Sequence, residues 1–82
     1  MYPTISLRRK IEQLRKLEEQ GYSITYYLLM DEKLATETLK VALLEVSNDN
    51  GFFELSYKAQ LTILNKIITR EVFRIASRKI IV

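Results

Sequence analysis

The chain contains no cysteine and no histidine, and only one proline and two glycines occur among its 82 residues. The absence of cysteine excludes a disulfide framework, a thiolate nucleophile and a cysteine-ligated zinc site. The absence of histidine removes the usual general base at neutral pH and the usual imidazole ligand of transition metals. Because tight turns need glycine and proline, their scarcity also argues against a β-sandwich or a β-barrel.

The remaining candidates for catalysis are carboxylates, and they form no pair that suits a reaction. Acid–base catalysis needs two such groups in one cleft, which a small bundle rarely provides. Asp31 and Glu32 are better explained as the start of a helix, and Asp49 as a turn residue. We therefore expect no catalytic residue, no metal site, no cofactor and no small-molecule substrate, and the protein is predicted not to be an enzyme.

Long apolar runs are also missing. The longest, residues 26–30 and 41–44, are far shorter than the roughly 20 residues that cross a bilayer as a helix. Met1-Tyr2-Pro3 does not resemble the start of a signal peptide. We expect a cytoplasmic protein with no membrane partner, in which residues 1–82 form a single domain.

Residues 4–20 are predicted to form the first helix. Apolar residues recur at intervals of four and three positions without a helix breaker. These residues are Leu7, Ile11, Leu14 and Leu17. Thr4 or Ser6 can cap the N-terminus by accepting a backbone N–H. Gly21 is expected to end the helix, because glycine enters the left-handed conformation at a helix C-terminus without steric penalty.

Residues 22–30 admit two interpretations. Their β-branched and aromatic content, with apolar residues in alternation, is typical of a strand. A helix would instead begin at Ser23 as N-cap and would place Ile24, Tyr27 and Leu28 on one face. We favour a short helix, because an isolated strand leaves its backbone hydrogen-bonding groups without partners.

A third helix is predicted from Asp31, which can serve as its N-cap, to Val46. Apolar residues lie on two of its sides, which predicts that the helix is sandwiched between neighbours. One side carries Ala35, Leu39, Ala42, Leu43 and Val46, and the other carries Leu34, Val41 and Leu44.

Residues 47–51, with the sequence Ser-Asn-Asp-Asn-Gly, form the clearest turn of the chain. They can also be read as the loop of a β-hairpin that pairs residues 41–46 with residues 52–56. We favour the helix, because residues 34–46 contain helix-favouring side chains without a break.

The last helix is predicted to run from its N-cap, Ser56, to about Arg78, a length of roughly 33 Å. Its main face is apolar at helical spacing, and a smaller apolar row lies on the opposite side. The main face consists of Tyr57, Leu61, Leu64, Ile68, Val72 and Ile75, and the smaller row of Ala59, Ile63 and Phe73. A homodimer packed through the first or last helix is the simplest way to cover both. The predicted fold is therefore all-α: a small bundle of three to four helices with a long amphipathic C-terminal helix, dimeric.

Charge is distributed unevenly, although the net charge is only +3. Residues 8–16, which include Arg8 and Arg9, contain five basic side chains and one acid. Residues 66–82 likewise contain five basic side chains and one acid. Residues 18–58 between them contain eight acids and three lysines. Two basic ends therefore flank an acidic middle.

A basic row at four-residue intervals follows the last helix. It consists of Lys66, Arg70, Arg74 and Arg78. Three interpretations remain open. The row can be a solvated face whose cations offset the helix dipole or pair with the acidic middle of the chain. It can instead meet a carboxylate-rich surface of another protein, or follow a phosphate backbone. The basic cluster in residues 8–16 would merge with this row if the first and last helices packed side by side.

We expect the function to be binding. The favoured hypothesis is a small cytoplasmic regulatory or adaptor protein, an inhibitor or modulator that lays a helical face onto an acidic or hydrophobic groove of a larger partner. Ile63, Phe73 and the basic row would face that partner, while the remaining apolar face would hold the core or the dimer. The alternative is a small basic regulator that binds nucleic acid.

Overall fold

The computed structural model describes the backbone of residues 6–81 and the side chains of residues 6–77. Three α-helices and one short 3₁₀ helix follow one another along the chain. They are α1 (Leu7–Leu29), α2 (Glu32–Ser47), η1 (Asn50–Glu54) and α3 (Tyr57–Ile81). The described residues contain no strand. The prediction of an all-α fold is confirmed.

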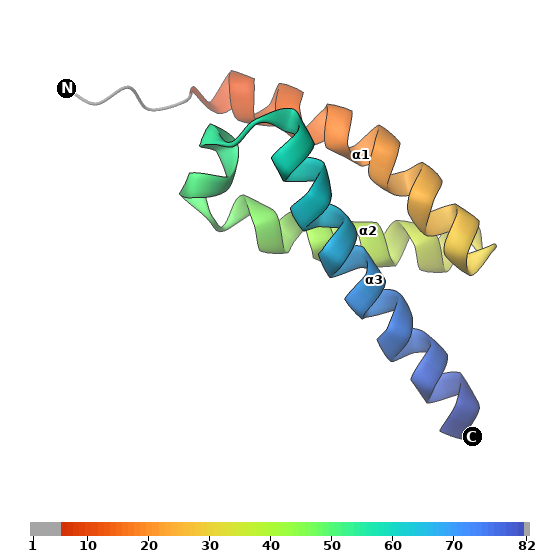
Figure 1. Ribbon diagram of the computed structural model, residues 1–82. Coiled ribbons are helices and arrows are strands. Elements are labelled where there is room, and N and C mark those ends of the chain that lie inside the picture. The colour runs from red at the N-terminus through yellow and green to blue at the C-terminus, as the bar shows by residue number, and fades with distance from the viewer. Residues whose placement is uncertain (1–5, 82) are drawn as a thin grey trace.

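The helices α1 and α2 lie side by side and run in opposite directions, and α3 crosses them diagonally (Figure 1). Each of the three α-helices contacts the other two. The second half of α3 extends beyond α2, away from α1 (Figure 1). The molecule is consequently elongated, with dimensions of 54 × 19 × 18 Å and a radius of gyration of 13.9 Å, whereas a compact chain of this length has about 12 Å.

Hydroxyl and carboxylate caps start the three α-helices. The backbone N–H of Arg9 donates to Ser6 Oγ over 3.3 Å, and Thr4, the alternative cap, lies outside the described residues. The N–H of Leu34 donates to Asp31 Oδ1 over 2.9 Å at the start of α2. At the start of α3, Ala59 N–H donates to the hydroxyl of Ser56 over 3.2 Å. The caps predicted at residues 6, 31 and 56 are therefore confirmed.

The prediction that Gly21 ends the first helix is wrong, and so is the separate element, helix or strand, at residues 22–30. The helix α1 continues through Gly21 to Leu29. A Cβ atom on Gly21 would lie 2.6 Å from Leu39 Cδ1 and 3.2 Å from Leu64 Cδ2. Gly21 therefore serves close packing: its missing side chain lets α2 and α3 approach the middle of α1.

The helix α1 ends where Met30 adopts the left-handed conformation, with φ of 53°. The backbone N–H of Met30 donates to the carbonyl of Tyr26 over 2.7 Å. Met30 thus takes the role that the sequence suggested for a glycine, and the link to α2 is only two residues long.

The hairpin alternative is wrong, because α2 reaches Ser47 and a 3₁₀ turn follows it. Asp49 Oδ1 accepts from the N–H of Gly51 over 2.9 Å and starts η1. This turn buries Phe52 and Phe53, whose rings meet edge to face with their centroids 5.5 Å apart. The two rings close the end of the core that α1 and α3 leave open.

The core lies where all three helices meet. It consists of Leu17, Leu39, Ala42, Val46, Phe52, Phe53, Leu64, Ile67 and Ile68. Gln60 is also buried, and its Nε2 donates to the carbonyl of Phe52 and to Gln13 Oε1, each over 3.0 Å. These bonds tie α3 to η1 and to α1.

Candidate functional site

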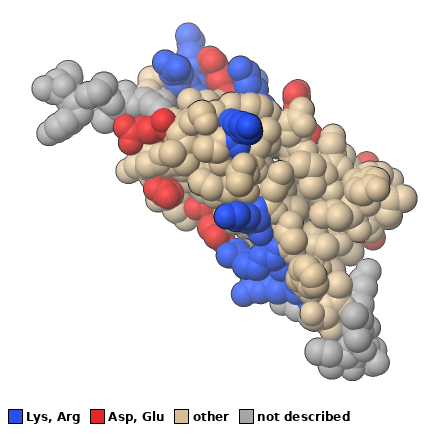
Figure 2. Space-filling view, in the orientation of Figure 1, with Lys and Arg blue, Asp and Glu red and all other residues tan. Residues whose placement is uncertain are grey.

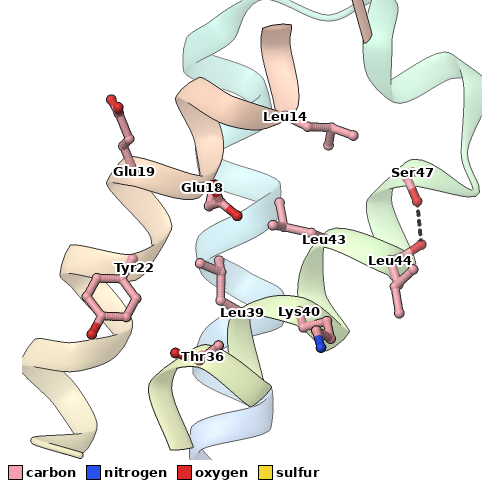
Figure 3. Close-up of a pocket in the computed structure, with 10 residues that line it drawn as sticks. All are labelled: Leu14, Glu18, Glu19, Tyr22, Thr36, Leu39, Lys40, Leu43, Leu44 and Ser47. Atoms are coloured by element: carbon pink, nitrogen blue, oxygen red, sulfur yellow. Dashed lines mark hydrogen bonds between the residues drawn. The ribbon is translucent and has the colours of Figure 1, made fainter. Parts of the chain in front are cut away.

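An apolar groove of about 680 Å³ runs between α1 and α2, and we call it the α1–α2 groove. The contribution of α1 is Leu14, Glu18, Glu19 and Tyr22. The contribution of α2 is Thr36, Leu39, Lys40, Leu43, Leu44 and Ser47. In Figure 3 α3 lies behind both helices, so the groove opens on the face that α3 does not cover.

The floor of the groove is made by leucines that point toward one another between the two helices (Figure 3). Leu39 is 4% exposed and belongs to the core, and Leu14 and Leu43 are half-buried against it. Leu44 stands at the rim and is 61% exposed. The prediction that α2 is sandwiched on both sides is therefore wrong for the single chain. Its first apolar side packs into the core, whereas Leu44 and Val41 of its second side remain exposed.

Charged and polar groups surround this floor. Glu18 and Glu19 stand on the α1 side and Lys40 on the α2 side, which leaves the lining with an excess of negative charge. The Tyr22 ring stacks on that of Tyr26, with centroids 6.0 Å apart. Partial burial, and then the carboxylate of Glu32, raise the pKa of the Tyr22 phenol above its ordinary value. At physiological pH the Tyr22 phenol that lines the groove is therefore neutral, and its hydroxyl can donate a hydrogen bond.

An uncharged, exposed region lies at the corner between α1 and α2. Residues 20–30 contain no charged side chain. Tyr27 is 78% exposed, Met30 73%, and Tyr26 and Leu28 are also exposed. At the other end of α1, Leu7 and Ile11 are exposed as well. Exposed apolar side chains thus lie on α1 both before and after the stretch that lines the groove.

Two members of the basic row, Arg70 and Arg74, are paired with acids of the same chain. Arg70 makes a two-pronged contact with Glu45 of α2, with Nη2 to Oε1 at 2.6 Å and Nη1 to Oε2 at 3.3 Å. Arg70 and Arg74 also contact Glu71 Oε2, at 3.1 and 3.3 Å. Lys66 is exposed, and the side chain of Arg78 lies outside the described residues. Of the three interpretations, pairing with the chain's own acids describes Arg70 and Arg74.

This pairing changes the titration of the groups involved. The hydrogen bond from Arg70 lowers the pKa of Glu45 below its ordinary value, against the opposing effect of desolvation. The same contact, with that to Glu71, raises the pKa of Arg70. Both groups therefore stay charged in the folded chain at neutral pH.

The second basic cluster lies on the first half of α1. Arg8 and Arg9 are exposed there, and Lys10 Nζ lies 5.3 Å from the centroid of the Phe53 ring. Figure 2 shows basic groups over this half of α1 and along α3, with acidic groups beside the latter. Acids thus interrupt the basic surface at α3.

The apolar residues predicted as an interface on α3 divide into three groups. Leu64 and Ile68 are buried in the core, and Leu61 and Ile75 are partly buried. Ile63 was expected on the outer row, but it is partly buried and packs against the core. Tyr57 is 43% exposed and Phe73 69% exposed. Phe73 alone of the expected outer pair projects into solvent.

Sequence reasoning missed the α1–α2 groove, although two signals pointed to it. The stripe that includes Leu14 and the second apolar side of α2, which includes Leu44, exceed what one small core can cover. Pairing these two rows across one groove required knowledge of where α3 packs.

Within the described residues, no group of three or more acidic side chains is placed to hold a metal ion, and no helix is long and apolar enough to cross a membrane. No protein-family model matches the chain, and no curated protein and no solved structure matches it.

Proposed function

We propose that the protein acts by binding another protein rather than by catalysis, and that the α1–α2 groove receives an apolar helix of that partner. The observation that carries this proposal is the groove itself, which has a volume of about 680 Å³ and an apolar floor. Leu44 stands at its rim and is 61% exposed. Docking of an amphipathic helix into a hydrophobic groove is a recurring mode of recognition. The chain is then a small regulatory or adaptor protein.

The dimensions of the groove suit a short helical segment. From Leu14 to Tyr22, α1 advances about 12 Å along its axis, so two to three turns of a bound helix would lie between α1 and α2. Because 61% of Leu44 is still exposed, covering it would contribute roughly 1–2 kcal/mol to such a complex. Tyr22, Glu18 and Lys40 would supply polar contacts at its edges.

The role proposed here differs from the one expected from the sequence. The expected docking face was α3, with Ile63 and the basic row turned toward a groove of the partner. Ile63 packs on the core, and Arg70 and Arg74 hold acids of the same chain. In the present proposal this chain provides the groove and the partner provides the helix.

A library of randomised helical peptides, displayed and selected on the immobilised protein, tests the proposal. Selected peptides should carry apolar residues at helical spacing and should bind Leu44→Asp about 10- to 100-fold more weakly than the wild type, the loss expected for one buried leucine. Val41→Asp is the matched control, because Val41 is also exposed on α2 but does not line the groove. Failure to enrich any peptide, or equal binding by Leu44→Asp, would refute the proposal.

A second candidate, binding of nucleic acid, is favoured by one observation. Arg8, Arg9, Arg15 and Lys16 are exposed on the first half of α1. Within residues 6–77, the ion pairs are made by Arg70 and Arg74, so no described acid neutralises these four cations. Contacts with phosphate would weaken steeply with salt, because each neutralised phosphate releases a counterion. A helix held in an apolar groove would not show that dependence.

A further inference from the structure

The second half of α3 has the chemistry of a ligand for the α1–α2 groove. Val72 still packs against the core, whereas the next residue, Phe73, is 69% exposed. In the sequence, Phe73, Ala76 and Ile80 are separated by three and four residues, the spacing of one helix face. Residues 72–82 contain no acid and three basic residues. We call residues 73–81 the α3 end.

The α3 end and the groove are complementary in length and in charge. From Phe73 to Ile80 a helix advances about 10 Å, close to the roughly 12 Å between Leu14 and Tyr22 along α1. The groove lining carries two glutamates and one lysine, whereas the sequence of the α3 end contains three basic residues and no acid, and one of these residues, Arg74, also contacts Glu71. An apolar stripe flanked by cations thus fits an apolar floor flanked by Glu18 and Glu19.

The α3 end cannot reach the groove of its own chain. The groove opens on the face of α1 and α2 that is turned away from α3 (Figure 3), and the α3 end runs outward beyond α2 (Figure 1). Since α3 is one uninterrupted helix of 25 residues, the segment has no bend that would return it. Only a second copy can bring an α3 end to this groove.

We propose that the α3 end of one copy fills the α1–α2 groove of a second copy, with Phe73 against Leu43 and Leu44 and its basic residues beside Glu18 and Glu19. When the contact is made in both directions, it closes a symmetric dimer with two equal interfaces. This inference rests on the proposed function, since it names a resident occupant of the same groove. The helix of a partner must then displace the α3 end, so self-association regulates access to the site.

Two variants that damage opposite halves of the contact provide the test. Leu44→Asp disrupts the groove and leaves the α3 end intact. Phe73→Asp disrupts the α3 end and leaves the groove intact. By analytical ultracentrifugation the wild type should have twice the chain mass of 9.7 kDa, and each variant alone should have the mass of one chain. An equimolar mixture of the two variants should again give the double mass, because one intact groove then meets one intact α3 end.

This complementation separates a broken contact from a broken fold, since two misfolded chains would not restore each other. Val41→Asp should remain a dimer. A wild type with the mass of one chain up to its solubility limit, or a mixture that stays at that mass, would overturn the inference. If the wild type is monomeric while displayed helical peptides still bind and lose affinity for Leu44→Asp, the proposed function stands and only self-occupancy fails. If the mixture of variants forms a dimer but no displayed peptide is selected, the groove is filled by a second copy and the proposal of an external partner is refuted.

Discussion

Arg70 of α3 and Glu45 of α2 face each other across the contact between their helices, joined by two hydrogen bonds of 2.6 and 3.3 Å between the guanidinium and the carboxylate. The fork of the guanidinium matches the two carboxylate oxygens, which gives the contact a defined direction. It links α3 to α2 and engages Arg70 with an acid of the same chain.

This contact predicts a dependence of stability on pH. Because Arg70 lowers the pKa of Glu45 in the folded chain, the contact stabilises the fold above the unfolded carboxyl pKa. The stabilisation is lost as pH falls through the folded pKa. In thermal melts recorded from neutral to acidic pH, the melting temperature of the wild type should fall more steeply than that of Glu45→Gln, because the glutamine side chain does not titrate. Parallel curves for the two proteins would mean that the contact does not contribute.

Substitution of Gly21 should destabilise the chain in proportion to side-chain size. A Cβ there meets Leu39 Cδ1 at 2.6 Å, and overpacking a core costs about 1–3 kcal/mol. Alanine recovers about 1 kcal/mol through helix propensity, so Gly21→Ala should lose up to about 2 kcal/mol and Gly21→Val more. Urea unfolding measures the free energies. Gln20→Ala, at the exposed neighbouring position, is the control and should not destabilise.

Gln60 should contribute more to the free energy of unfolding than a surface glutamine does, because its buried amide donates to both Phe52 O and Gln13 Oε1. Gln60→Ala would leave the buried Phe52 carbonyl without this donor and open a small cavity, at a cost of about 1–3 kcal/mol of unfolding free energy. Gln13→Ala removes only the second acceptor and should cost less. If urea unfolding gave the same loss of unfolding free energy for both variants, the hydrogen bond to Phe52 would make no additional contribution to stability.

A dimer closed through the α3 end predicts that thermal stability depends on protein concentration. Association stabilises the folded chain by mass action, so the melting temperature of the wild type should rise with concentration. Leu44→Asp should melt at one temperature across the same range, and Val41→Asp should behave as the wild type. Circular dichroism melts over a wide series of dilutions make the comparison.

Binding of duplex DNA by the basic row of α3 should be weak, because two of its members already hold carboxylates of the chain. The exposed cations on the first half of α1 are then the candidates for contacts with phosphate. Fluorescence anisotropy of a labelled random duplex between about 50 and 200 mM salt measures DNA binding. The contrary result would be binding at micromolar affinity, with a slope of about −4 or steeper when the logarithm of the binding constant is plotted against that of the salt concentration. If the double substitution Arg8→Glu with Arg9→Glu abolished this binding, nucleic acid would become the favoured partner. The same double substitution should leave peptide binding in the groove unchanged, since neither arginine lines it.

The sequence by itself determined the features that depend on neighbours along the chain. Ser6, Asp31 and Ser56 cap helices because each acceptor lies three residues before the N–H that it meets. The helical spacing of apolar residues likewise determined the all-α class, because it recurs along the chain without the glycines and prolines that would break it.

Only the tertiary structure decided the features that join distant segments. Gly21 could equally end a helix or admit close neighbours, and the crossing of α2 and α3 at that point selected the second role. Arg70 finds Glu45, 25 residues earlier, only because α3 crosses α2 there. The α1–α2 groove arises in the same way: local spacing makes two apolar rows, but the face on which α3 packs decides which of them stays uncovered.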